Sequence, residues 1–289
     1  MVNYCSKMMF IERKYVTKYL ENTCLIKYYY ERGNYMKKVG YRVYFRPEWV
    51  IPFVEKYISF FSVMQIKATQ RFMDDVYLQS FASYCKKKGI EKLSFHLPEE
   101  TLVDENRCER VCDFISENDQ SCYVTMVTSF WGNLAESDYF SYALAKVAKD
   151  RAVTVALENV KVGKNLLKYF DALKELAVTH GFKVCLDIGY LFYSISKSNT
   201  PADLVVDYLK KDIWWKENIV ELHLHDYTAL GCHKNIGEGL LYKSIWHVRD
   251  IIEYVNDDVP IFFETPIQDL ETQGVIEVRE FFNRLNKVK

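Results

Sequence analysis

The chain has 289 residues, more than a minimal domain and within the range that a single β/α barrel occupies. Hydrophobic residues make up 49% and charged residues 27%, which predicts a large apolar core and excludes extended disorder. With 38 basic against 39 acidic residues, the charge indicates neither a nucleic acid nor an anionic membrane surface as a partner. No apolar stretch reaches the roughly 18 residues of a membrane span, so we expect no crossing of a membrane.

The cysteines and the N-terminal region bear on location and domain organisation. Eight cysteines are scattered without a CxxC pair, and a chain of this size does not need disulfide bonds. We therefore expect reduced thiols and a cytoplasmic protein. Residues 1–37 are basic and aromatic but lack the apolar segment and cleavage site of a secretory signal. We expect them to form an extension, as a capping helix rather than a basic surface arm, with Met36 as an alternative start; residues 38–289 form the barrel domain.

Short β-branched or aromatic runs alternate with amphipathic stretches from residue 38 onward, eight of each. Strands are expected at 39–45, 63–68, 92–97, 122–129, 153–159, 183–188, 219–226 and 259–265. Helices are expected between them, among others at 166–180, 202–211 and 242–255. An open doubly wound sheet usually carries a glycine-rich phosphate loop after its first strand, where this chain has Arg46-Pro47. The sequence therefore predicts an α/β fold, a single-domain (β/α)8 TIM barrel.

Five of the predicted strands carry an acid or a histidine at the carboxyl end, although buried strands should be apolar. These residues are His96 in SFHLP, Glu158 in VALEN, Asp187 in VCLDIGY, His223 and His225 in ELHLHD, and Glu264 in IFFET. The carboxyl ends of barrel strands line one mouth, where the active site lies. The alternation in the seventh strand turns Glu221, His223 and His225 toward the inside. Several carboxylates in a dry mouth repel one another unless a cation compensates them, so the pattern predicts a bound metal ion.

Four motifs at these strand ends resemble those of the xylose-isomerase-like barrel superfamily. That superfamily includes sugar and sugar-phosphate isomerases and epimerases and the endonuclease IV type AP endonucleases (family 2). The motifs are ALEN, CLDIGY, HLHD followed by HKNIGEG, and FFETP, and the resemblance covers Lys38 to the C-terminus. In the epimerase branch one divalent ion is held by two glutamates, an aspartate and a histidine. The residues that match are Glu158, Asp187, His223 and Glu264.

The resemblance implies a metal-dependent isomerase or epimerase in which Glu158 and Glu264 form the catalytic pair. An ion that chelates a hydroxyl and a neighbouring carbonyl acidifies the adjoining C–H and stabilises an enediolate. One glutamate can then remove a proton while the other returns it from the opposite side. Three carboxylates and one imidazole suit manganese, magnesium or cobalt, and zinc is also compatible.

Five further residues near the mouth are expected to contact the substrate, a small sugar or sugar phosphate: His96, Tyr190, His225, His233 and Glu238. Tyr190 stands where the family has a histidine. With a reference pKa of about 10, a tyrosine donates a hydrogen bond more readily than it transfers a proton at neutral pH. The loop 231–239 either binds phosphate or caps the next helix, and both alternatives stay open. The chain is compatible with a homo-oligomer.

A metal-dependent phosphodiesterase or apurinic endonuclease is the second hypothesis, and a binding protein without turnover is the third. The nuclease branch of the family needs three zinc ions, and His96 and His233 match two of its ligand positions. No histidine stands near 129–130, however, and Tyr190 and Gly231 occupy two further ligand positions. The near-neutral charge also argues against a DNA-facing surface. The isomerase hypothesis is therefore favoured.

Overall fold

The computed structural model describes residues 37–44, 57, 61–67, 84–85, 87–96, 109–110, 112–113, 116, 123–130, 142, 144–265 and 273–288, with the backbone alone at 44 and 123–130. Apart from Lys37, the predicted N-terminal extension lies outside these residues, and its structure stays a prediction. None of the described helices combines the length and the apolar character that crossing a membrane requires.

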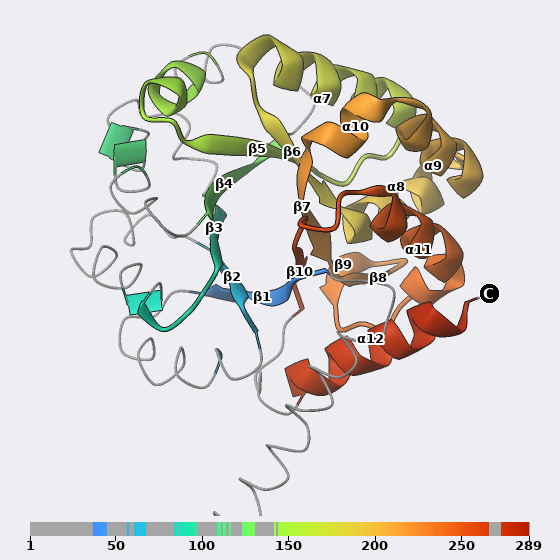
Figure 1. The fold of residues 1–289 in the computed structure, drawn as a ribbon. Helices are drawn as coiled ribbons and strands as arrows, with labels where there is room; N and C mark the ends of the chain where they lie inside the picture. The colour runs from blue at the N-terminus through green and yellow to red at the C-terminus, as the bar shows by residue number, and fades with distance from the viewer. Residues whose placement is uncertain are drawn as a thin grey trace, which may run out of the picture.

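Eight of the described strands form one parallel sheet that closes on itself, because β1 pairs with both β2 and β10 (Figure 1). Each lies within two residues of its predicted bounds. The strands are β1 Val39–Tyr44, β2 Val63–Lys67, β3 Lys92–His96, β4 Tyr123–Phe130, β5 Thr154–Asn159, β6 Lys183–Asp187, β7 Ile219–Leu224 and β10 Ile261–Phe263. The α/β barrel that the alternation predicts is confirmed.

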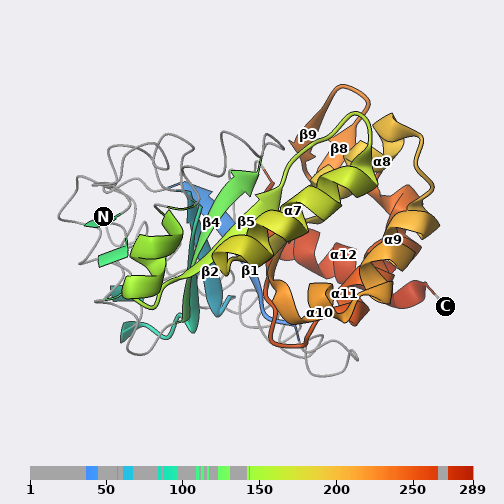
Figure 2. The same cartoon turned by 90° about the horizontal axis from the view of Figure 1, so that it is seen from above.

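Helices surround the second half of the barrel (Figures 1 and 2). They are α7 Leu166–His180, α8 Ile188–Ser198, α9 Ala202–Lys211, α10 Ile213–Asn218, α11 Ile245–Tyr254 and α12 Val275–Lys287. The first and third match the predicted bounds. The helix predicted at 242–255 is wrong at its start, where a 3-10 turn, Leu241–Ser244, precedes α11; the N–H of Leu241 donates to Asp226 Oδ1 at 2.8 Å. Helical residues are described after each of the first four strands, at 57, 84–85, 109–110 and 144–150 among others, while the starts of these helices lie outside the described residues, so that their extents stay predictions.

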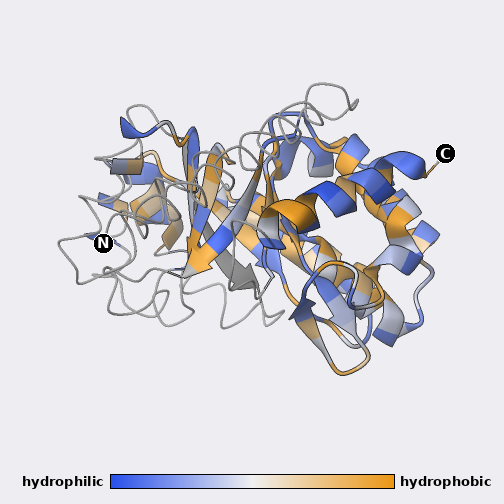
Figure 3. Ribbon diagram, turned by 90° about the horizontal axis from the view of Figure 1, so that it is seen from below, coloured by the Kyte–Doolittle hydropathy of each residue, from blue (hydrophilic) through white to orange (hydrophobic). Residues whose placement is uncertain are grey.

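Alternation along the strands separates two environments. Outward-facing residues such as Leu157, Leu186 and Leu222 pack with the helices in one large apolar cluster. The helices carry both apolar and polar residues, which alternate along each helix as in amphipathic helices (Figure 3). Inward positions are polar on several strands and are nonetheless buried, namely Gln65, Ser94, His96, Glu158, Asp187, Glu221 and His223. The barrel interior is thus where chemistry is concentrated.

An antiparallel hairpin that the sequence did not predict follows β7 at the carboxyl end of the barrel (Figure 2). Its strands are β8 Asp226–Thr228 and β9 Gly231–Lys234. The buried Asp226 carboxylate accepts from the backbone N–H groups of Gly237 and Gly239, each at 2.9 Å. Asp226 therefore holds the glycine loop against the strand end, and the hairpin returns the chain to the mouth.

Candidate metal centre

The structure brings together the four residues that the sequence predicts as metal ligands. Glu158 lies in β5, Asp187 ends β6, His223 lies in β7, and Glu264 directly follows β10. One ligand atom of each residue lies within 4.8 Å of the others. All four side chains belong to residues that are at most 2% exposed. Because parallel strands present their carboxyl ends at one mouth, residues 106 positions apart in sequence (158 to 264) meet there.

Opposite charges hold this cluster together. His223 Nδ1 lies 2.5 Å from Glu158 Oε1 and 2.9 Å from Glu264 Oε1. Burial alone would raise the pKa of Glu158, but His96 and His223 hold it well below its usual range. Burial likewise opposes ionisation of Glu264, yet Arg42 and then His223 lower its pKa. Both carboxyl groups are therefore charged at neutral pH, as metal ligands must be.

Three carboxylate oxygens in the cluster have no hydrogen-bond partner among the described residues: Asp187 Oδ2, Glu264 Oε1 and Glu264 Oε2. Arg42 Nη1 lies 2.5 Å from Glu264 Oε2, but the two groups meet without hydrogen-bond geometry. Buried carboxylate oxygens are almost always paired with a donor or a cation. These oxygens and His223 Nδ1 are the donor set that a divalent ion takes, so the residues present fit one.

Asp187 is oriented by contacts that occupy its backbone and one of its oxygens. Its Oδ1 caps α8 by accepting from Tyr190 N at 2.7 Å, which leaves Oδ2 directed elsewhere. Its backbone N–H donates to Asn159 Oδ1 at 2.8 Å, and Asn159 Nδ2 donates to its carbonyl oxygen at 3.0 Å. His225 Nε2 lies 3.2 Å from Oδ1. Burial would lower the pKa of His225, but the Asp187 carboxylate raises it.

Gly189 makes room for the His225 ring. A Cβ added at this position would lie 2.3 Å from His225 Cε1 and Nδ1, and His225 is fully buried. Alanine normally stabilises a helix relative to glycine, but here the clash opposes it. We expect Gly189→Ala to lower the free energy of unfolding by about 1–3 kcal/mol and to weaken metal binding, because His225 can no longer sit beside Asp187.

Urea unfolding and manganese titration measure both effects. Gly163→Ala is the matched control, because Gly163 is exposed and an added Cβ meets nothing within 4 Å. If the two variants were equally stable and bound manganese equally well, the packing of His225 would have no bearing on the centre.

The second ring nitrogen of His223, Nε2, faces a group of buried polar side chains formed by Glu221, Gln65 and Ser94. Glu221 Oε1 lies 3.1 Å from His223 Nε2 and accepts from Gln65 Nε2 and Ser94 Oγ, each at 2.7 Å. Lys92 Nζ lies 4.0 Å from the other Glu221 oxygen. Gln65 Nε2 and Glu221 Oε1 therefore occupy His223 Nε2, at 2.6 and 3.1 Å, and Nδ1 is the nitrogen directed at the Glu158 and Glu264 carboxylates. The alternation in the seventh strand predicts that Glu221 faces inward, but no motif in the sequence indicates its role.

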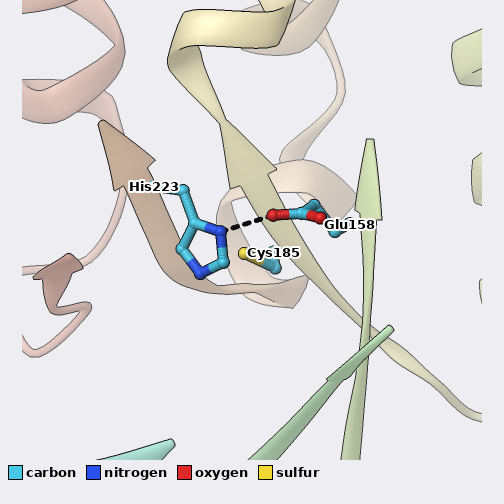
Figure 4. Close-up of side chains that lie close together, drawn as sticks. All are labelled: Glu158, Cys185 and His223. Carbon is cyan, nitrogen blue, oxygen red and sulfur yellow. Dashed lines mark hydrogen bonds and ion pairs between the residues drawn. The ribbon is translucent and has the colours of Figure 1, made fainter. Parts of the chain in front are cut away.

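Two more residues at the centre were missed. Arg42 faces inward from β1, with a side chain that is 7% exposed, and its alternation with the core residues Tyr41 and Val43 is the signal that could have found it. Cys185, two residues before Asp187, places its sulfur beside the His223 ring and the Glu158 carboxylate (Figure 4). Burial raises the pKa of its thiol. Both residues lie in predicted strands, at inward positions without a motif that marks them.

Besides His225, which lies beside Asp187, the predicted substrate contacts divide into three groups. His96 Nε2 lies 3.1 Å from Glu158 Oε2 at the centre. Tyr190 Oη lies 2.8 Å from His233 Nε2, and His233 Nδ1 lies 3.7 Å from Glu264 Oε2. Burial and then His225 lower the pKa of His233 to about 4, so this imidazole is neutral at pH 7. Glu238 differs from the others, because its side chain is exposed and accepts from Asn235 Nδ2 at 3.1 Å.

Neither a protein-family model nor a curated protein sequence matches the chain. Solved structures do match. A D-psicose 3-epimerase in the presence of D-fructose has a TM-score of 0.54 at 13% identity, over 86% of this chain and 96% of its own. A D-psicose 3-epimerase with D-tagatose from Clostridium cellulolyticum H10 has a TM-score of 0.52 at 12% identity, over 86% and 94%. A psychrophilic glycoside hydrolase family 10 endo-β-1,4-xylanase has 0.54 at 11%, over 91% and 99%.

These neighbours include an epimerase and a xylanase, two different chemistries on one architecture, so a likeness at this level of identity carries the fold alone. The chain has the TIM-barrel fold that these solved structures share.

Proposed function

We propose that the protein is a divalent-metal-dependent isomerase or epimerase acting on a small sugar or sugar phosphate. The observation that carries this proposal is the meeting of Glu158, Asp187, His223 and Glu264, whose ligand atoms lie within 4.8 Å of one another with three buried carboxylate oxygens lacking a hydrogen-bond partner. Similarity of fold to the D-psicose 3-epimerases supports it. Manganese, magnesium and cobalt suit this oxygen-rich set, and zinc is compatible with it.

The reaction that we propose is a proton transfer at carbon. A bound divalent ion would supply the Lewis acidity that makes the C–H beside a substrate carbonyl acidic. Glu158 and Glu264 are the two charged glutamates of the centre, and we assign them as the pair that removes the proton and returns it. Arg42, 2.5 Å from Glu264, would add a fixed positive charge to the centre, which favours the negative charge of an enediolate.

A neutral imidazole suits the recognition of a hydroxyl group. His233 is neutral at pH 7 and lies in hydrogen-bond contact with Tyr190, and we assign both to substrate hydroxyl groups together with His96. The glycine loop offers less to a phosphate than its sequence suggests, because the N–H groups of Gly237 and Gly239 already donate to Asp226. This favours an unphosphorylated sugar.

The experiment is an exchange assay that detects proton transfer whichever isomer is formed. The full chain, loaded in turn with manganese, magnesium, cobalt or zinc, is incubated in D2O with a panel of ketoses, aldoses and their phosphates. Proton NMR then reports loss of a C–H signal and the appearance of an isomer. Metal-dependent exchange with one sugar class is the expected result. No exchange with any panel member in a protein that binds one ion per chain would count against the proposal.

The hydrolase hypothesis keeps one favouring observation, the contact of His96 with Glu158, because a histidine beside a bridging glutamate is what a second ion would use. We expect His96→Ala and His233→Ala to weaken substrate binding and to leave one bound ion per chain. Two ligands seldom hold zinc, which normally takes three or four protein groups.

Metal analysis of each variant beside the parent protein measures the stoichiometry, and cleavage of an abasic DNA duplex tests the hydrolase directly. A loss of one whole ion from either variant, with the Glu158 site still filled, would make a multinuclear hydrolase the better assignment.

A further inference from the structure

Cys185 lies on the inner face of β6, two residues before Asp187, and the proposed function makes no use of it. Its side chain is fully buried, and it packs in a small cluster with Ala156, separate from the main apolar core. The two flanking residues, Val184 and Leu186, belong to that main core. The thiol is therefore directed into the polar interior rather than toward the helices.

Three kinds of ligand atom meet at this position. One ligand atom from each of Glu158, Cys185 and His223 lies within 4.8 Å of the other two, and all three residues are buried. Figure 4 shows the sulfur beside the imidazole ring and the carboxylate, which come from three adjacent strands. A second carboxylate, Glu264, borders this cluster, with its Oε1 2.9 Å from His223 Nδ1.

We propose that Glu158, Cys185 and His223 form a second metal site, which takes a thiophilic ion such as zinc or cadmium. A carboxylate, an imidazole and a thiolate are ligands that zinc accepts together, whereas magnesium and manganese prefer oxygen and leave the sulfur unused. On binding, a metal–sulfur bond replaces the S–H bond, and the released proton leaves to solvent. No oxidant or reductant takes part.

The two sites exclude each other, because both need Glu158 and His223. Glu158 and His223 are two of the four ligands of the candidate metal centre. A thiophilic ion bound through Cys185 occupies both, so it displaces an oxygen-preferring ion such as manganese from that centre. The consequence is that zinc or cadmium competes with manganese for this protein. This inference uses only the ligand geometry, so it holds whatever reaction the barrel catalyses.

Ultraviolet absorption tests the site, because sulfur-to-metal charge transfer appears only when a thiolate ligates the metal. The metal-free full chain is titrated with cadmium, and free manganese is followed by electron paramagnetic resonance in a parallel titration. We expect wild-type protein to show the charge-transfer band and excess manganese to diminish it. Cys185→Ala should lose the band and bind cadmium at least about tenfold more weakly, while manganese affinity changes little.

Controls separate this thiol from the others. Cys232→Ala and Cys112→Ala remove described cysteines outside the cluster and should keep the full cadmium band. Cys185→Ser keeps the size of the side chain and should reproduce the loss if the alanine variant folds poorly. A band that is absent from wild-type protein, or that survives both Cys185 variants, would overturn the proposal. A cadmium band in a protein that binds none of manganese, magnesium and cobalt would instead count against the oxygen-rich centre of the proposed function and leave this site standing.

Discussion

Glu264→Gln is expected to lower turnover by about 10²–10⁴-fold while the barrel stays folded. The amide fills the same volume beside Arg42 and His223 but cannot accept a proton. It also removes a negative charge from the centre, so metal binding weakens. Loss of even an outer contact to a metal ligand costs about 10–100-fold in affinity, and the loss of a ligand's charge should cost at least as much.

Turnover of the sugar identified by deuterium exchange, measured at saturating metal, separates the catalytic effect from the binding effect. Circular dichroism and thermal unfolding report the fold. Glu280→Gln is the control, because Glu280 is an exposed glutamate on α12 and its substitution should leave all of these values near wild type. Full activity of Glu264→Gln at saturating metal would remove Glu264 from the proton transfer.

His223→Ala is expected to have the largest effect on stability. In the metal-free protein the imidazole lies among the carboxylates of Glu158, Glu264 and Glu221, at 2.5, 2.9 and 3.1 Å. Burial would lower the pKa of His223, but Cys185, Glu264 and Glu158 raise it well above its ordinary value. Removing the cation leaves buried negative charges uncompensated, which costs about 3–5 kcal/mol of unfolding free energy.

The pH dependence has a defined sign. A raised pKa in the folded state means that His223 stabilises the protein below its unfolded pKa and loses this effect as pH rises through the folded value. The lowered pKa of Glu158 means the reverse: its contribution is present above its unfolded pKa and is lost as pH falls through the folded value. The deficit of His223→Ala should therefore be largest near neutral pH and shrink in acid, where the carboxyl groups take up protons.

Urea unfolding of the metal-free proteins between neutral and acidic pH measures this difference. The control is His247→Ala. Among the described residues, the ring nitrogens of His247 contact one group, the exposed carboxylate of Asp203. The free energy of unfolding is therefore expected to change by no more than about 1 kcal/mol. A His223→Ala deficit that did not change with pH would show that lost packing, rather than lost charge, is responsible.

Sequence by itself determined the architecture of this protein and the membership of its central cluster. Buried parallel strands consist of short apolar runs in the sequence. Polar residues at their carboxyl ends, such as Glu158 and Glu264, are therefore easy to recognise. The helix Leu166–His180 was predictable to the residue, because its apolar spacing and Gly181 are local signals. Because barrel topology brings strand ends to one mouth, residues far apart in sequence could be assigned to one site before any distance was known.

Only the tertiary structure decided what surrounds that cluster. Glu221, Gln65 and Cys185 occupy inward positions in different strands, and their contacts with His223 or one another depend on the register between strands, which no local pattern encodes. The Asp226 carboxylate and the glycine loop that it holds are likewise joined by folding rather than by spacing. Sequence names the residues that face a barrel's interior; the register of the closed sheet decides which of them touch, and therefore which nitrogen, oxygen or sulfur atom each one offers.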